Sequence, residues 1–193
     1  MIKSMLERKL IVNKTDQSGA RQKEEITLRA AQPEDAPGIH RLMREAYNAL
    51  TDKSLFVCDE ESFIRSQLTD SGCGVVACSA AGQIVGSFVL RFPHDAPDNL
   101  GRDIGLSPEE LTKVVHMESA AVAPAYQGNG LQRRMLKFAE ETIDTTRYSI
   151  ALVTVSPDNP ASYKSFERAG YRLVLTKEKY GGLPRRIYMK HLT

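Results

Sequence analysis

Apolar residues recur along the chain with two periods, and each period predicts one kind of element. A spacing of three and four residues predicts a helix that begins at Pro33, where a proline and two acids suit the first turn. The apolar stripe of this helix consists of Ile39, Leu42, Met43, Ala46, Tyr47 and Leu50. The same spacing predicts an amphipathic helix from Leu131 to Ile143 and, more weakly, a helix over residues 60–68.

Short apolar runs between turn residues predict strands. They cover residues 26–30, 75–79, 84–91, 114–122, 150–155, 171–176 and 186–190. Two further helices are predicted from their first residues: one is capped by Ser107, the other by Asp158 or Asn159 and ended by Gly170. Strands that alternate with helices around several hairpins predict one layered α/β domain.

The first part of the chain lacks such a pattern. Residues 13–25 are polar and have no apolar period, which predicts a linker. The chain is therefore divided into an N-terminal extension at 1–25, whose flexibility is left open, and a domain at 26–193.

Composition narrows the functional classes. The 193 residues are 41% apolar and 26% charged, a globular balance, and a net charge of +2 argues against a nucleic-acid partner. No apolar run is long enough for a membrane span, and the N-terminus does not read as a signal peptide. The three cysteines lack metal-ligand spacing. We therefore expect reduced thiols, no metal and a cytoplasmic location, without a membrane partner.

The segment from Val122 to Gln132 carries the clearest chemistry. A predicted strand ends at Pro124, a glycine-containing loop follows, and a helix begins. Unpaired N–H groups at a helix start, together with the helix dipole, favour a phosphate group. Gly128 and Gly130 allow the backbone to approach such a ligand closely. Two glycines alone fit a plain strand-to-helix turn equally well.

This segment resembles the coenzyme A signature of the GNAT acetyltransferases, Gln/Arg-x-x-Gly-x-Gly/Ala. Gln127 and Gly130 match it, whereas Gln132 stands where the family has glycine or alanine. Downstream, Asn159, Gly170 and Tyr171 match the helix motif Asn-x-x-Ala-x-x-x-Tyr-x-x-x-Gly-Phe. The resemblance spans roughly residues 26–192.

The resemblance implies a fold and a cosubstrate. The expected fold is a mixed, mostly antiparallel sheet of about six to seven strands, flanked by helices and splayed between the fourth and fifth strands. Acetyl-coenzyme A would lie in the splay, bound by strand backbone, by the loop and helix start, and by the asparagine. The residues that match these parts are Ala120, Ala121, Val122, Gln127, Gly128, Asn129, Gly130, Leu131, Gln132, Arg133 and Asn159.

The resemblance also suggests catalytic residues. Relatives often carry the general base six or four residues before the valine equivalent to Val122, positions that His116 and Glu118 occupy here. Glu118 is the first choice, and His116 could share or relay the proton. The tyrosine that protonates the departing thiolate in many relatives is replaced by Phe166, so Tyr163, one helical turn earlier, is the expected substitute.

The expected activity is direct acetyl transfer from acetyl-coenzyme A to a primary amine in a ternary complex. The alternative is a catalytically reduced domain that binds coenzyme A as a sensor or interaction module. The acceptor is a small molecule or a peptide. Acidic residues in 52–70 and 92–113 suggest a cationic one. A homodimer is left open.

Overall fold

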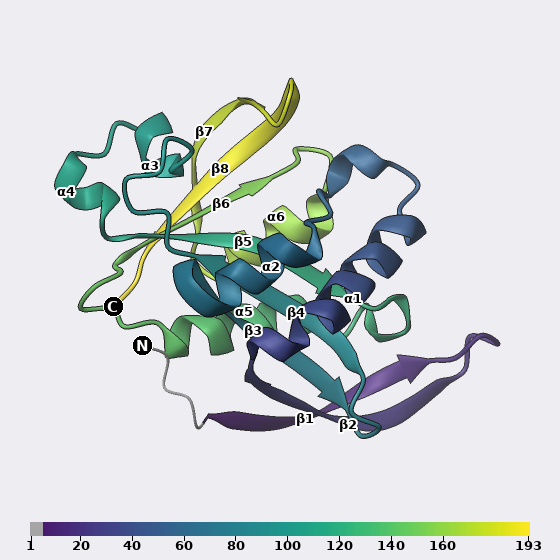
Figure 1. Cartoon of the computed structure of the whole chain (residues 1–193). Helices are drawn as coiled ribbons and strands as arrows, with labels where there is room; N and C mark the ends of the chain where they lie inside the picture. The colour runs from purple at the N-terminus through teal and green to yellow at the C-terminus, as the bar shows by residue number, and fades with distance from the viewer. Residues whose placement is uncertain (1–5) are drawn as a thin grey trace.

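The computed structural model of the chain describes residues 6–193, so residues 1–5 of the expected extension lie outside it. Figure 1 shows strands and helices interleaved along the chain. The strands are β1 (Glu7–Thr15), β2 (Arg21–Ala30), β3 (Gly72–Ser79), β4 (Ile84–Arg91), β5 (Val114–Val122), β6 (Ile150–Val155), β7 (Arg172–Lys179) and β8 (Leu183–His191). The helices are α1 (Ala36–Ala49), α2 (Glu61–Ser66), α3 (Leu100–Asp103), α4 (Pro108–Leu111), α5 (Leu131–Thr142) and α6 (Pro160–Arg168).

All eight strands join one sheet in the order β1-β2-β3-β4-β5-β6-β8-β7. Every neighbouring pair is antiparallel except β5 and β6, which are parallel. The predicted mixed, mostly antiparallel sheet is therefore confirmed, with eight strands in place of the six to seven expected.

The additional strand comes from the N-terminal segment, where the predicted linker is wrong. Residues 13–15 belong to β1 and residues 21–25 to β2, with a turn between them, and the two strands pair from Glu7 with Arg29 to Thr15 with Arg21. β1 is an edge strand, and Val12 is its one buried residue. Charged side chains suit such an edge because they discourage pairing with other chains. They also remove the apolar period by which a strand is recognised.

The sheet opens between β5 and β6. The two strands pair only from Val114 with Ile150 to His116 with Leu152, and the rest of β5 has no partner on that side. β5 also bulges, because Met117 pairs with Leu90 and Ser119 with Val89, which leaves Glu118 extra. A bulge increases the local twist and re-aims a side chain. The predicted splay is thus confirmed, and the fourth and fifth strands of the prediction are β5 and β6 here.

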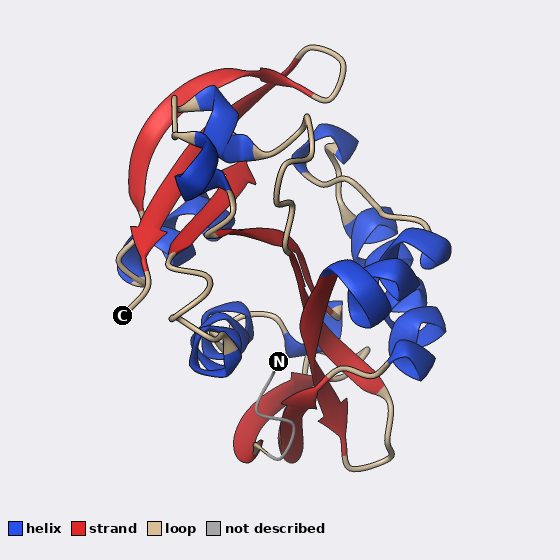
Figure 2. Ribbon diagram, turned by 60° about the vertical axis from the view of Figure 1, so that its left-hand side comes forward, coloured by secondary structure: helices blue, strands red, loops and turns tan. Residues whose placement is uncertain are grey.

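Helices cover both faces of the sheet, with α1 and α2 on one side and α5 on the other (Figure 2). α1 buries Ile39, Leu42 and Met43, and α5 buries Met135 and Phe138. Each such side chain contributes roughly 1.5–3 kcal/mol when fully buried. The apolar periods seen in the sequence are therefore the faces that hold the helices on the sheet.

Three predicted helix ends, on α4 and α6, are confirmed. Ser107 accepts a hydrogen bond from the N–H of Glu110, whose carboxylate accepts one from the N–H of Ser107. The side chain of Asn159 accepts from the N–H of Ser162 at the start of α6. Gly170, with a φ of 91°, follows α6 in the left-handed region that favours glycine.

Candidate active site

A groove with a cavity of about 620 Å³ lies where β5 and β6 diverge. Every residue expected to contact the cofactor lines it, except Asn129. These residues are Ala120, Ala121, Val122, Gln127, Gly128, Gly130, Leu131, Gln132, Arg133 and Asn159. Two sequence motifs from separate helices therefore meet at one cavity.

The turn before α5 depends on two glycines in the left-handed region. Gly128 has a φ of 78° and Gly130 one of 64°. A side-chain carbon placed at Gly128 would meet nothing within 4 Å, so the turn presents open backbone. Gly130 precedes α5 without a side-chain cap, which leaves the first N–H groups of the helix unpaired. With the helix dipole and Arg133 beside them, these groups fit a pyrophosphate.

Asn129 has a different place from the one expected. Its side chain accepts a hydrogen bond from the N–H of Asn13 at 2.9 Å and donates to the carbonyl of Asn13 at 2.7 Å. It also donates to the carbonyl of Tyr126. Asn129 therefore fastens the turn to β1 and does not line the groove. Tyr126 adds a second link, because its hydroxyl donates to Glu24 on β2 at 2.9 Å.

Asn159 and Gln132 stand at the inner end of the groove. The carbonyl oxygen of the Asn159 side chain caps α6, and within residues 6–193 its amide has no protein acceptor. The amide of Gln132 donates a long hydrogen bond of 3.4 Å to the hydroxyl of Ser162. Gln132, which stands where the expected motif has glycine or alanine, thus reaches from α5 to α6 with its long side chain.

Sequence reasoning missed part of the groove wall. Ala46, Leu50 and Phe56 contribute from the end of α1 and the segment after it, and Ser165 and Arg168 from α6. Ala46 and Leu50 are the last members of the α1 apolar stripe. On α6, lining residues recur at the helical spacing that begins at Ala161. The apolar stripe of α1 and the helical spacing on α6 could therefore have indicated these lining residues from the sequence.

A smaller cavity of about 220 Å³ adjoins the groove. The two share lining residues, including Ala120, Gln132 and Asn159. The ionisable residues that line the smaller cavity come from three separate segments of the chain: Asp59, Glu118, and Tyr180 with Arg185. We refer to this space as the acceptor cavity, after the acceptor that the sequence resemblance leads us to expect.

His116 and Glu118 are neighbours with different access. Glu118 lines the acceptor cavity, whereas His116 is 3% exposed and lines neither cavity. The Nε2 of His116 accepts a hydrogen bond from the N–H of Leu100 at 3.0 Å. Nδ1 therefore carries the proton of the neutral ring, and it lies 3.5 Å from Oε2 of Glu118. His116 therefore lies directly behind the Glu118 carboxylate.

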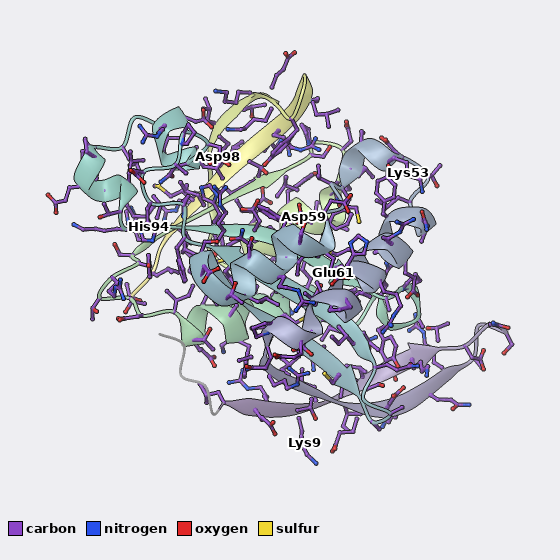
Figure 3. All side chains as sticks on the ribbon, viewed as in Figure 1. Lys9, Lys53, Asp59, Glu61, His94 and Asp98 are labelled. Atoms are coloured by element: carbon purple, nitrogen blue, oxygen red, sulfur yellow. The ribbon has the colours of Figure 1, made fainter. Side chains whose placement is uncertain are left out.

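Asp59, which the sequence did not single out, lies beside Glu118 in the acceptor cavity. Figure 3 shows it near the middle of the molecule, whereas Lys9 and Lys53 project at the edges. Burial, and secondly the charge of Glu118, raise the pKa of Asp59 to about 6. Two carboxyl groups therefore share one small space.

Tyr163 lies away from both cavities. The guanidinium carbon of Arg186 stands 4.7 Å from the centre of its ring. Phe166, at the position usual for tyrosine, is buried and packs edge-on against Phe88 and Tyr171. The tyrosine that does line the acceptor cavity is Tyr180, whose hydroxyl lies 2.9 Å from that of Thr154.

The acidic residues of 92–113 are largely neutralised within the protein. Asp98 forms a two-pronged pair with Arg91, and Asp103 pairs with Lys177 and Lys179. Glu109 forms an ion pair with Lys113, and the carboxylate of Glu110 accepts a hydrogen bond from the N–H of Ser107. The net charge of the segment therefore does not describe a free acidic surface.

Within residues 6–193, no group of three or more His, Cys, Asp or Glu side chains is placed to hold a metal ion. No helix in this range is both long enough and apolar enough to cross a membrane.

Comparison with known structures gives several neighbours of similar fold. The acetyltransferase yncA of Salmonella typhimurium, solved with acetyl-CoA and described as putative, is 18% identical, with a TM-score of 0.63 over 87% of this chain and 94% of the other. The ribosomal-protein-S18-alanine N-acetyltransferase of Escherichia coli is 14% identical, with a TM-score of 0.65 over the same shares. The phosphinothricin acetyltransferase of Sinorhizobium meliloti, also solved with acetyl-CoA, is 20% identical, with a TM-score of 0.63 over 86% and 88%.

At these identities the neighbours establish the fold alone. A search of curated proteins finds no match. The sequence itself matches the model of the family described as Acetyltransferase (GNAT) family over residues 37–171, well over half of the chain. This range contains the splay, the glycine turn and the Asn159 helix. The chain therefore belongs to the GNAT acetyltransferase family.

Proposed function

We propose that the protein transfers the acetyl group of acetyl-CoA directly to a primary amine while both substrates are bound. The observation that carries the proposal is the continuity of the two cavities. The groove, with its open glycine turn, meets a smaller cavity that contains Glu118, and Asn159 borders both. An amine that enters from one side can thus reach a thioester that arrives from the other.

The groove residues would bind the cosubstrate by backbone and positive charge. Ala120 to Val122 lie on the unpaired side of β5, where their backbone groups are available to an extended ligand. The N–H groups that follow Gly130 would hold the pyrophosphate, with Arg133 and Arg168 beside them. Acetyl-CoA would supply a thioester carbonyl carbon as the electrophile.

Glu118 would act as the general base. An alkyl ammonium has a pKa near 10.4, so it must lose a proton before its nitrogen can attack. Glu118 lines the acceptor cavity and can take this proton directly or through water, and His116 positions the carboxylate from behind. The new C–N bond forms as the C–S bond breaks. The proton from the amine passes through Glu118 to solvent.

The thiolate needs no dedicated acid from α6. A thiol pKa near 8.5 makes the thiolate a fair leaving group at neutral pH. Phe166 cannot donate a proton, and Tyr163 faces Arg186. Solvent protonation is therefore sufficient, and a mechanism without an α6 tyrosine remains complete.

Two measurements test the function. Acetyl-CoA should raise the melting temperature, and at 100 times its dissociation constant should stabilise the fold by about 2.7 kcal/mol. Release of free thiol with a panel of primary amines, lysine peptides and amino acids should then follow transfer. Binding without transfer to any acceptor would favour the catalytically reduced alternative. Absence of binding at millimolar acetyl-CoA would overturn both.

The fold neighbours do not choose the acceptor. The names of two of them refer to different acceptors, a ribosomal-protein alanine and phosphinothricin. The acceptor of this chain must therefore be read from its own cavity.

A further inference from the structure

The acceptor cavity contains a buried cation whose charge has no acidic partner. Arg185, at the start of β8, is 3% exposed. Its guanidinium donates to the carbonyls of Ser54 and Pro184, at 2.8 and 2.9 Å. Within residues 6–193 no carboxylate lies in ion-pair distance of it. Buried charges are normally paired, so a buried guanidinium that lines a cavity indicates an anionic ligand.

Burial lowers the pKa of Arg185, a direction that fits a guanidinium held without a counter-ion. Two N–H groups are used by the carbonyls, and the guanidinium has five in all. The remaining donors suit a planar two-oxygen group, because the guanidinium fork matches a carboxylate.

The same cavity is acidic elsewhere. Asp59 and Glu118 line it from the segment before α2 and from β5. The hydroxyl of Ser119, the residue after Glu118, is buried beside Asp59. The centre of the Tyr180 ring lies 5.6 Å from the guanidinium carbon of Arg185, but no carboxylate among the described residues pairs with this guanidinium. A cavity with two carboxylates and a separate guanidinium that lacks an anionic partner is complementary in charge to a zwitterion. Its volume of about 220 Å³ restricts the occupant to a compact molecule.

We propose that the acceptor is a compact amino acid, whose amino group lies between Asp59 and Glu118 and whose carboxylate pairs with Arg185. This inference deepens the proposed function, on which it rests. It also replaces the expectation of a purely cationic acceptor, because an unpaired guanidinium in the cavity would repel a polyamine. Arg185 is then a specificity-determining residue and Glu118 remains the base.

A purely structural role is the competing explanation. The contact with Ser54 ties the segment after α1 to β8, and its loss would disturb any acceptor equally. The two explanations differ in what they predict for acceptors that lack a carboxylate. A charge-recognition role affects carboxylates alone.

The experiment compares the common L-amino acids with their carboxamides, which keep the shape but lose the negative charge. Wild type should acetylate the best amino acid with a kcat/KM about 10- to 100-fold above that of its carboxamide. The amino group of a carboxamide loses its proton more readily, so basicity cannot produce this preference. Arg185→Met should remove the preference by lowering only the amino-acid value.

Two further variants distinguish a loss of charge recognition from a loss of folding. Arg185→Lys keeps the charge without the fork and should retain part of the preference, mainly through a raised KM. Arg186→Met is the matched control, because Arg186 is the next residue along β8 but lies over the ring of Tyr163, outside both cavities. This variant should keep the whole preference. Circular dichroism reports folding of each variant.

The outcomes are distinct. No preference in wild type, or an equal loss for both acceptors in Arg185→Met, overturns the inference while leaving amine acetylation intact. If no acceptor is acetylated at all, the proposed function fails. The inference about the acceptor is then tested by calorimetry, which measures the binding of the amino acid and of its carboxamide to the coenzyme A-loaded protein. Tighter binding of the amino acid than of its carboxamide supports the inference, and equal or absent binding overturns it.

Discussion

The groove and the acceptor cavity adjoin each other but are built in different ways. The part of the groove that runs from β5 to α5 presents mainly backbone: the unpaired side of β5, two left-handed glycines and a helix start. The ionisable side chains of the acceptor cavity come from the segment before α2, from β5, from the β7–β8 turn and from β8. A backbone-built site tolerates many sequences around a few fixed glycines. A side-chain-built site can change its ligand with single substitutions. The first suits a shared cosubstrate and the second a particular acceptor.

The largest expected effect tests the backbone-built half. Gly130→Asp should weaken acetyl-CoA binding at least 100-fold, because a carboxylate at the helix start repels phosphate. Calorimetry measures the affinity, and circular dichroism reports the fold. Gly130→Asn is the matched control, since asparagine has the same shape and tolerates the left-handed φ of 64°. Equal losses in the two variants would show that shape, not charge, governs the turn.

The next effect belongs to the side-chain-built half. Glu118→Gln should lower kcat by roughly 10² while the dissociation constant of acetyl-CoA stays within about twofold. The comparison of the two halves predicts this separation of rate from cofactor affinity. If His116→Gln is inactive and Glu118→Gln is active, the histidine is the base after all. A loss of cofactor affinity in Glu118→Gln would show that the two cavities are not independent.

A third, smaller effect concerns stability. Burial and the charge of Glu118 raise the pKa of Asp59 from 3.8 to about 6. Between these pH values the folded protein holds a proton on Asp59 that the unfolded chain has lost. The contribution of Asp59 to the free energy of unfolding therefore falls as the pH rises from about 4 to 6. Above pH 6 the charged carboxylate carries the full cost of its burial and of repulsion by Glu118. Asp59→Asn should be more stable than wild type by about 1–2 kcal/mol at pH 8 and nearly equal to it at pH 4.

Chemical denaturation at the two pH values measures this difference. The same variant should raise the KM of the best acceptor, so stability and acceptor binding change in opposite directions. An equal stability change at both pH values would assign the effect to packing rather than to charge.

The smallest expected effect is that of Tyr163→Phe. Its ring packs beside Arg186 outside both cavities, so kcat should remain within about twofold of wild type. A tenfold loss would return the tyrosine to the mechanism and require α6 to turn in the ternary complex. Thiol release under saturating substrates is the measurement.

The same contrast explains what could be predicted from the sequence. The residues proposed to bind the cofactor, apart from Asn159, follow one another along β5, the turn and α5, so a contiguous motif predicts them. Asp59 lies 59 residues before Glu118, and Tyr180 and Arg185 lie more than 60 residues after it, so only tertiary packing brings them together. Tyr163 was expected in the site because it lies three residues before Phe166, but that step turns the side chain about 60° around the helix. The structure shows that this rotation is enough to take it outside the cavity.

For the fold, periodicity succeeded where elements are buried on one side. The bounds of β5 and β6 were predicted as the structure has them, because their apolar runs are covered by neighbours. β1 was missed because an edge strand needs few apolar residues. The bulge at Glu118 has no sequence signal of its own and depends on the register between β4 and β5.

The link between Asn129 and β1 has a consequence for how the protein is made. Asn13 and Asn129 are 116 residues apart, and Glu24 and Tyr126 are 102 apart. At a synthesis rate of 5–20 residues per second, the hairpin waits roughly 5–20 s for its partner to emerge. A nascent chain that stops short of residue 126 holds the β1–β2 strands but none of the turn they fasten. Contacts of such long sequence separation form slowly, so we expect the glycine turn before α5 to be among the last parts to take shape.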